Sequence, residues 1–511
     1  MGKVRQHWLI GAGLTVVLFA VPLWLFLPKS TAREFKDPWA NIVKKRIHLD
    51  HSAFFSKAFD TPQEVTRACL ECHPDAAKDL MKTAHWKWEG DPVMVPGHAE
   101  PVKIGKKNLL NNFCIGIQGN WGGCTSCHAG YGWEDDSFDF NAEANVDCLI
   151  CHDWSGSYVK GVKGLPKPGV DLLAVAKNVG YPRRDNCGTC HIYGGGGMGV
   201  KHGDLDNTLV NPTEDIDVHM GKYDLLCIDC HTTRKHDIRG KAYSVSVNHE
   251  NGIDCIDCHD AVPHRDRRIN AHLSSLACQT CHIPTYAKKA PTKMDWDWSK
   301  AGDATRKEDP HHYLKIKGEF IYDMNVVPEY AWFNLKSFRY LLGDKIDPST
   351  PTYMNKPMGD ITDKNAKIWP FKVHRARQPY DKVFNYLLLP VTFGEGGFWH
   401  DFDWDKALRL GAEVSKMEYS GQYGFTETYM QWPLSHMVSP SHQALQCDQC
   451  HEEKSRLDWK ALGYEGDPKK FGSRQFTTPT QGNPAKPEPA TTPQKDSNTE
   501  KIETNQKGRP S

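Results

Sequence analysis

The sequence lacks an excess of charge of either sign. It has 63 lysines and arginines against 63 aspartates and glutamates, so its formal net charge is zero, which gives no indication of a nucleic-acid partner. Apolar residues are also scarce, because hydrophobic types make up 39% of the chain and its mean hydropathy is -0.60. These values are low for 511 residues that must bury a core. We therefore expect something besides side chains to supply buried apolar surface.

Cysteines outside one repeated pattern are nearly absent. Of the 17 cysteines, only Cys114 lies outside the pattern Cys-x-x-Cys-His, which occurs eight times. The motifs consist of Cys69, Cys72 and His73; Cys124, Cys127 and His128; Cys148, Cys151 and His152; Cys187, Cys190 and His191; Cys227, Cys230 and His231; Cys255, Cys258 and His259; Cys278, Cys281 and His282; and Cys447, Cys450 and His451.

This motif is the attachment signal for c-type haem. Its two thiols reach the two vinyl groups of one porphyrin, and the adjacent imidazole becomes the proximal iron ligand. Zinc ribbons pair Cys-x-x-Cys units without requiring the following histidine, and disulfides do not require this spacing. The sequence therefore predicts eight covalent haem c groups, which would supply the missing apolar surface.

The haems also set the fold class that we expect. We predict a mainly α protein with extensive irregular structure, in which short helices and long connections surround a stack of eight haems. Seven of the motifs lie between Cys69 and His282. Neighbouring haems should therefore lie close enough for electrons to pass between them.

The N-terminal residues 1–32 resemble a membrane anchor or an export signal. Lys3 and Arg5 precede an uncharged run over residues 8–28, which is long enough to span a bilayer. Positive charge on the short N-terminal side predicts an exported body. Residues 30–32, Ser-Thr-Ala, leave a cleaved signal peptide as the alternative to an anchor. In both cases we expect the body to face the periplasm.

The remainder divides according to its motifs. Residues 33–290 form a seven-haem domain, and residues 441–470 carry the eighth haem. Residues 291–440 hold no motif but many aromatic residues, so we expect a mixed, mostly irregular covering layer with a few helices, one near residues 404–414, or else a small separate domain. The polar residues 471–511 lack apolar periodicity and are expected to be a disordered tail.

The second, distal ligand of each iron decides whether that haem conducts electrons or performs chemistry. Seventeen histidines lie outside the motifs, more than seven bis-histidine haems require. Each is either a ligand or an ordinary surface or packed histidine. The candidates that lie shortly before or after a motif are His51, His85, His219, His236, His249, His264, His272, His436 and His442.

Three further stretches carry a family resemblance. They are Asn111-Asn112-Phe113-Cys114, the segment from Cys124 to Trp133, and the glycine run after His191 that leads to Lys201-His202-Gly203-Asp204. With the eight motifs, they resemble the octahaem tetrathionate reductase family of c-type cytochromes. The resemblance extends from about His51 to His451. The apolar N-terminus and the polar tail depart from that family.

The resemblance implies that one haem is catalytic and has a lysine as its distal ligand, with a cysteine nearby. By motif, this is the haem on Cys124, Cys127 and His128, and the lysine is Lys201. The glycines before Lys201 would let the backbone approach a haem closely. Without the resemblance, the same loop would be interpreted as a flexible surface loop with an exposed Lys-His pair.

Other residues near these stretches are candidates for substrate contact. Cys114 is either a buried spectator or a thiol able to form mixed disulfides with sulfur substrates. The other candidates, which could instead be ordinary solvated or loop residues, are Lys106, Lys107, Asn111, Asn112, His202 and Asp204.

The resemblance implies reduction of a small inorganic substrate, an oxidised sulfur or nitrogen compound such as tetrathionate, nitrite or hydroxylamine. Electrons would come from a membrane or periplasmic donor protein or from a quinol-linked donor. Two alternatives stay open. In the first, the chain is an electron conduit whose irons are all permanently six-coordinate. In the second, it is an enzyme that works in the opposite direction and oxidises a reduced nitrogen or sulfur compound.

Overall fold

The computed structural model describes residues 8, 11–21, 35–42, 47–113, 116–241 and 243–474. Cys114 and the candidate cleavage site at residues 30–32 lie outside them. The contacts of the chain divide it after Arg474 into two units. The second unit, Gln475–Ser511, lies outside the described residues, and with it most of the predicted disordered tail.

The N-terminal apolar segment is only partly described. Its residues 11–21 are helical and exposed. Among the residues that the structure describes, no helix is both long and apolar enough to cross a membrane. The predicted anchor therefore has no support in the described part of the chain, which leaves out residues 22–34.

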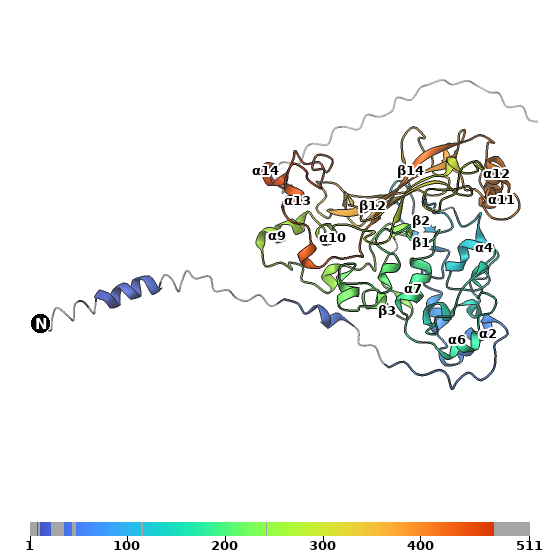
Figure 1. The fold of residues 1–511 in the computed structure, drawn as a ribbon, viewed down its shortest axis with the longest axis horizontal. Coiled ribbons are helices and arrows are strands. Elements are labelled where there is room, and N and C mark those ends of the chain that lie inside the picture. Colours follow the sequence, from blue (N-terminus) through green and yellow to red (C-terminus); the bar gives the residue numbers. More distant parts are fainter. Residues whose placement is uncertain are drawn as a thin grey trace, which may run out of the picture. The chain divides into compact units, whose positions relative to one another are not determined.

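Helices are short and fall mainly in the segments that carry the motifs (Figure 1). The described α-helices are α2 (Pro62–Cys72), α3 (Ala76–Leu80), α4 (Trp121–Cys124), α5 (Leu149–His152), α6 (Leu172–Lys177), α7 (Arg184–His191), α8 (Cys227–Cys230), α9 (Arg267–Ala271), α10 (Cys278–His282), α11 (Phe398–Asp401), α12 (Trp404–Ser415), α13 (Asp448–His451) and α14 (Pro468–Phe471). Short 3-10 turns complete two motifs, η2 (Thr125–Cys127) and η8 (Cys255–Asp257).

Each motif thus occupies about one helical turn. Residues three apart on a helix are neighbours on its surface, so the two thiols of a motif lie on the same side. In α10, for example, Cys278 and Cys281 begin and nearly end the helix, and His282 is its last residue. This local geometry is what attachment of one porphyrin to both thiols requires.

The part of the sequence between the seventh and eighth motifs forms a large β-sheet. Its strands are β5 (Thr292–Asp297), β6 (Tyr313–Leu314), β7 (Gly318–Asp323), β8 (Glu329–Phe333), β10 (Thr352–Tyr353), β12 (Lys367–Asp381), β13 (Tyr386–Leu387) and β14 (Tyr423–Pro433). Two-stranded sheets are formed by β1 (Glu89–Val93) with β2 (Val102–Gly105), β3 (Thr233–Arg234) with β4 (Asp237–Ile238), and β9 (Ser337–Arg339) with β11 (Asn355–Pro357).

The long strands β12 and β14 form the centre of the large sheet. They pair antiparallel from Phe371 opposite Pro433 to Asp381 opposite Tyr423. The strand order is β10-β14-β12-β5-β7-β6, with β8 and β13 also paired to β12. Eleven of the 15 residues of β12 are buried, including the unbroken run from Ile368 to His374, as expected for a stretch covered on both faces.

This sheet corrects the expectation for the haem-free segment. The mainly α prediction suits the motif segments only, and the mostly irregular layer expected over residues 291–440 is wrong, because the strands of the large sheet lie there. Pro370 and Pro379 lie inside β12, and proline normally argues against a central strand. The helix expected near residues 404–414 is confirmed as α12.

The sheet packs directly on the motif segments. Ile368 of β12 bridges to Leu276, just before α10, and its carbonyl accepts a hydrogen bond of 2.6 Å from the Thr280 hydroxyl inside α10. Further along, Phe113, Val200 and Trp432 belong to one buried apolar cluster. The haem-free segment therefore forms one wall of the region that holds the motifs.

Candidate haem-binding and active site

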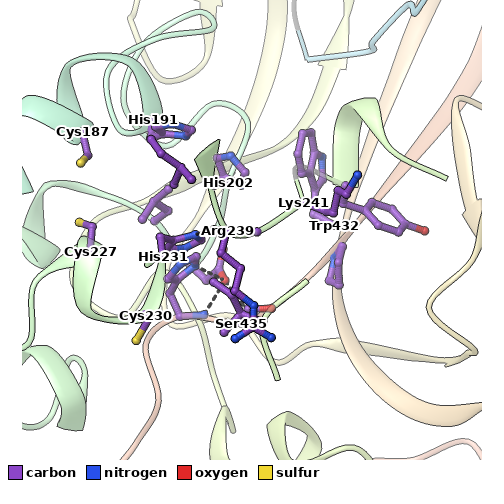
Figure 2. Close-up of a pocket in the computed structure, with 18 of the residues that line it drawn as sticks. Cys187, His191, His202, Cys227, Cys230, His231, Arg239, Lys241, Trp432 and Ser435 are labelled. Atoms are coloured by element: carbon purple, nitrogen blue, oxygen red, sulfur yellow. Dashed lines mark hydrogen bonds and ion pairs between the residues drawn. The ribbon is translucent and has the colours of Figure 1, made fainter. Parts of the chain in front are cut away.

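A large cavity runs among the motifs. Its volume is about 2970 Å³, and its walls include cysteines or histidines from seven of the eight motifs, all except the first. Figure 2 shows one part of it, where His191, His202 and His231 lie around a common space, with the thiols of Cys187 and Cys227 at its edge. A cavity of this size, with paired thiols at its wall, fits covalently bound haem.

Six motif histidines face a second histidine from another part of the chain. Two metal–nitrogen bonds of about 2 Å, plus the distance from each nitrogen to its ring centre, require ring centres roughly 6 Å apart. The pairs and their centroid separations are His73–His51 (6.4 Å), His191–His85 (6.1 Å), His231–His436 (6.4 Å), His259–His219 (6.1 Å), His282–His264 (6.1 Å) and His451–His272 (6.0 Å). These spacings fit bis-histidine iron.

The structure thus brings six of the nine predicted distal histidines opposite a motif histidine. The other three have no facing ring at such a distance within the described residues. His236 lies close enough to His152 for its charge to lower the pKa of His152, although burial is the larger cause. His249 Nε2 instead lies 3.2 Å from Asp254 Oδ1, and His442 is exposed in the turn after Pro440.

Backbone carbonyls orient several of the ligand imidazoles. The Nδ1 atoms of His152 and His231 lie 2.8 Å and 2.9 Å from the oxygens of Gly180 and Arg239. His272 Nδ1 makes a similar contact of 2.8 Å with Arg268 O. A proton held on Nδ1 by a carbonyl leaves the other nitrogen free to bind metal.

His128 differs from the paired motif histidines. Its Nε2 atom lies 2.8 Å from the oxygen of Trp86, and within the described residues no histidine ring faces it. Aromatic rings surround it instead, with centroids 4.8 Å away for Trp86 and 4.7 Å away for Trp133. Burial, the main cause, lowers the pKa of His128 to about 4, so its imidazole is neutral and able to bind metal.

The glycine run positions Lys201 between two motifs. A side chain at Gly194 would approach within 2.7 Å of Cys127 Sγ and 2.4 Å of the oxygen of Cys190, so only glycine allows this passage. Gly195 has φ of +74°. Lys201 Nζ donates to Cys190 O at 3.2 Å, and the side chain lines the cavity. The loop therefore brings Lys201 close to the motif that contains His128.

His202 and Asp204 occupy the same loop. The His202 ring lies 4.8 Å from that of Trp432, and burial, the main cause, lowers its pKa to about 3. Asp204 is buried and accepts backbone hydrogen bonds from Ser435 at 2.7 Å and His436 at 2.9 Å. Their predicted roles in substrate contact stay predictions, but the Asp204 carboxylate already has protein partners.

The Asn111-Asn112-Phe113 segment is attached to the large sheet. Asn112 is fully buried, and its Nδ2 atom donates to His374 O at 2.8 Å and to Thr428 O at 3.0 Å. The carbonyl of Asn111 accepts from Gln378 Nε2 at 2.8 Å. These contacts hold the segment in place, and a substrate role for either asparagine stays a prediction. Cys114, next in the chain, lies outside the described residues.

Sequence reasoning missed Lys372 and His374, which β12 contributes beside the Lys201 loop. Lys372 Nζ donates to Lys201 O at 3.1 Å, to Val200 O at 3.2 Å and to Thr292 Oγ1 at 2.7 Å. Both side chains are fully buried. The available signal was a lysine and a histidine two residues apart within an apolar and aromatic stretch, which indicates one buried face of a strand.

Three comparisons with known proteins bear on this geometry. A model of the family "Cytochrome c bacterial" matches residues 293–454, which include the large sheet and the last motif. An octahaem cytochrome c from Shewanella oneidensis, known from its crystal structure, is 48% identical with a TM-score of 0.78, and the match covers 83% of this chain and 98% of that one. An uncharacterised protein of Archaeoglobus fulgidus is 25% identical over 241 residues, 37% of this chain and 80% of that protein.

The comparisons agree with the motifs, the cavity and the facing histidines. The Shewanella relative is matched over almost its whole length at an identity that shows common family membership. Covalent haem c is therefore the cofactor, and the eight motifs agree with the octahaem description of that relative. The chain belongs to the octahaem c-type cytochromes.

Proposed function

We propose that this octahaem cytochrome reduces a small oxidised sulfur or nitrogen compound at the haem on Cys124, Cys127 and His128, with Lys201 as its exchangeable distal ligand. Tetrathionate, nitrite and hydroxylamine are the candidate substrates. Within the described residues, six motif histidines face a second imidazole and two, His128 and His152, do not. One observation carries the proposal: of these two, His152 has His236 near it, whereas the motif of His128 has the Lys201 loop passing beside it.

The chemistry of the two ligand types supports a division of labour. An imidazole is largely neutral at pH 7 and binds iron durably, whereas an amine must first lose a proton. A lysine ligand is therefore displaced more readily by a substrate. Haems with two histidines pass electrons, and a haem with a displaceable lysine can bind substrate.

The charge beside Cys127 suits an anionic substrate. The ammonium group of Lys106 lies near enough to act electrostatically on the Cys127 sulfur, whereas Lys201 carries no charge while it ligates iron. When bound, the haems supply electrons one at a time and an iron position for the substrate. For tetrathionate, two electrons break the central sulfur–sulfur bond and yield two thiosulfate ions. No proton is consumed, so the charge of Lys106 need only attract and orient the anion.

The electron donor belongs to the same proposal. We place the body in the periplasm, since the positive N-terminus and the apolar run predict export, and a membrane anchor at residues 1–32 is part of this proposal. A membrane or periplasmic donor protein, or a quinol-linked donor, would then reduce one of the bis-histidine haems. The facing histidine pairs provide the route toward His128.

Replacement of Lys201 tests the proposal. Lys201→Ala should turn one haem high-spin while the other low-spin signals persist, and should change the turnover of tetrathionate, nitrite or hydroxylamine by at least about tenfold. Lys201→His should keep that haem low-spin and suppress turnover, because imidazole exchanges less readily. Lys406→Ala, on the exposed face of α12, is the matched control and should change neither the electron paramagnetic resonance spectrum nor the rates.

A non-catalytic electron conduit is the second candidate, and the six facing histidine pairs favour it. In a conduit, every iron stays six-coordinate during turnover. Wild-type protein would then show no haem that binds added nitrite or hydroxylamine, and that result would replace the enzyme proposal with the conduit. Spectra and turnover of Lys201→Ala that equal those of wild type would instead show that the assignment of Lys201 is wrong.

A further inference from the structure

The carboxylate of Asp204 is directed at a ligand histidine. Its Oδ2 atom accepts the backbone N–H groups of Ser435 and His436 and lies 3.3 Å from His436 Nδ1. The residue is buried, with 3% of its surface exposed. All three contacts join the Asp204 carboxylate to the segment that carries His436. The carboxylate is therefore held against the His436 ring.

His436 faces the motif histidine His231. Their ring centroids are 6.4 Å apart and the rings are inclined by 20°. The two imidazoles have different partners on their Nδ1 atoms, because His231 contacts the carbonyl of Arg239 and His436 contacts the carboxylate of Asp204. The iron of the haem attached to Cys227 and Cys230 would thus have two histidine ligands with different partners. The Nδ1 atom of one contacts a neutral carbonyl, and the Nδ1 atom of the other contacts a charged carboxylate.

The same arrangement occurs once more, at the last motif. His451 Nδ1 lies 2.6 Å from Asp467 Oδ1, and the His451 ring faces His272 with centroids 6.0 Å apart. Asp467 also accepts from Lys469 N at the start of α14, which holds the carboxylate in place. Here the charged partner backs the motif histidine, and the facing His272 has the carbonyl of Arg268.

Within the described residues, no other facing pair has a carboxylate at hydrogen-bonding distance. His219 comes nearest, with its Nδ1 atom 3.9 Å from Asp217 Oδ1, which is too long for a hydrogen bond. His51 has a carbonyl partner, the oxygen of Leu49 at 2.8 Å. Among the facing pairs of the described residues, carboxylate-backed imidazoles therefore occur only at the fifth and eighth motifs.

We propose that Asp204 and Asp467 are positioning residues that lower the reduction potentials of these two haems below those they would have with a neutral partner. A carboxylate on Nδ1 makes an imidazole a more basic ligand, and its negative charge stabilises ferric over ferrous iron. Tenfold stabilisation of the ferric state corresponds to about 59 mV for a one-electron couple. The haem on Cys227 and Cys230 therefore gives up its electron more readily.

This placement bears on the proposed function. Lys201 begins the loop that reaches Asp204, so one short segment provides the proposed exchangeable ligand and orients the ligand of a nearby haem. If Lys201 acts as proposed, the loop that provides the exchangeable lysine also holds the ligand of a haem with a lowered potential. The assignment of Asp204 and Asp467 does not depend on that role, because it concerns potentials and not turnover.

The test is a redox titration of the haem-loaded protein, followed by absorbance and electron paramagnetic resonance. Asp204→Asn and Asp467→Asn keep the shape of the side chain and remove its charge. In each variant, one low-spin haem should shift to a higher reduction potential. Its ferric-to-ferrous ratio at a fixed applied potential should change at least tenfold. The ratios of the other haems should change much less. Combining the two changes should shift two haems.

Asp206→Asn is the matched control, because Asp206 is buried in the same loop and caps the turn at Thr208 without contacting a ligand histidine. The inference is overturned if the Asn variants, shown by mass to carry their haems, titrate like wild type, or if Asp206→Asn shifts the same haem equally. Asp204→Glu, which keeps the charge, should shift less than Asp204→Asn. If Asp204→Asn does not assemble, Asp467→Asn decides the claim.

Discussion

The side-chain nitrogen of Lys372 lies 3.1 Å from the backbone oxygen of Lys201. The same nitrogen donates to Val200 O and Thr292 Oγ1, and the residue is fully buried. A fully buried nitrogen cannot exchange these bonds for bonds to bulk water, so β12 determines the path of the loop that carries Lys201. The haem-free segment therefore shapes the proposed site, in addition to providing His436 opposite His231.

Loss of this contact should weaken both the fold and the loop. Lys372→Met keeps the length of the side chain but leaves buried carbonyls without a donor, at a cost of about 1–3 kcal/mol in the free energy of unfolding. One haem should change its spectrum, because the Lys201 loop is no longer held. Denaturant unfolding and low-temperature spectra check this. Lys406→Met, at an exposed position of α12, should leave both unchanged, and an equal effect there would contradict the interpretation.

Removal of a facing histidine should affect a single iron. The rings of His264 and His282 are parallel within 1° and their centroids lie 6.1 Å apart. His264→Ala should convert one low-spin haem to high-spin, while denaturing mass measurement still finds eight covalent haems, since the thiols are untouched. His442→Ala, at an exposed histidine without a facing ring, should leave the spectra as in wild type. Unchanged spectra in His264→Ala would show that this pair does not ligate iron.

Acid should destabilise the protein partly through His374. This residue is fully buried, and neither ring nitrogen has a hydrogen-bond partner among the described residues. Burial above all, together with the charge of Lys372, holds its pKa well below the ordinary value. In the unfolded chain the imidazole takes up a proton near pH 6.5. Above about pH 6.5 the His374 ring is neutral in both the folded and the unfolded chain, so it costs no stability. Below that pH the unfolded chain alone binds the proton, and the free energy of unfolding falls by up to about 1.4 kcal/mol per pH unit.

Unfolding of His374→Leu over the acid range measures this contribution. The variant lacks the titrating group, so its stability should fall less steeply than that of wild type between about pH 6.5 and pH 5. His312→Leu, which removes an exposed histidine, should follow the wild-type slope. Parallel slopes for wild type and His374→Leu would mean that His374 is protonated in the folded protein.

The local sequence was sufficient to predict features that depend on residues close together in the chain, namely the haem attachment sites and one helix. The Cys-x-x-Cys-His spacing identified eight haem attachment sites, because the two thiols and the imidazole lie within one helical turn. The helix near residues 404–414 was also predicted, and the structure shows it as α12 with Asp403 as its N-cap. Histidines close to motifs could be named as candidates, but nothing local distinguished His264, which faces His282, from His442, which faces no ring.

Contacts between distant residues were decided by the tertiary structure. His436 lies opposite His231, and Asp204 backs it, only because the chain returns from the large sheet to the motif region. The strand β12 contains two prolines and was not recognisable by itself, since pairing with β14 stabilises it. Sequence thus determined the cofactor and its covalent attachment, which are local chemistry. The pairing of ligands, the wall formed by Lys372 and the environment of each iron required the fold, because they join residues that only long-range packing brings together.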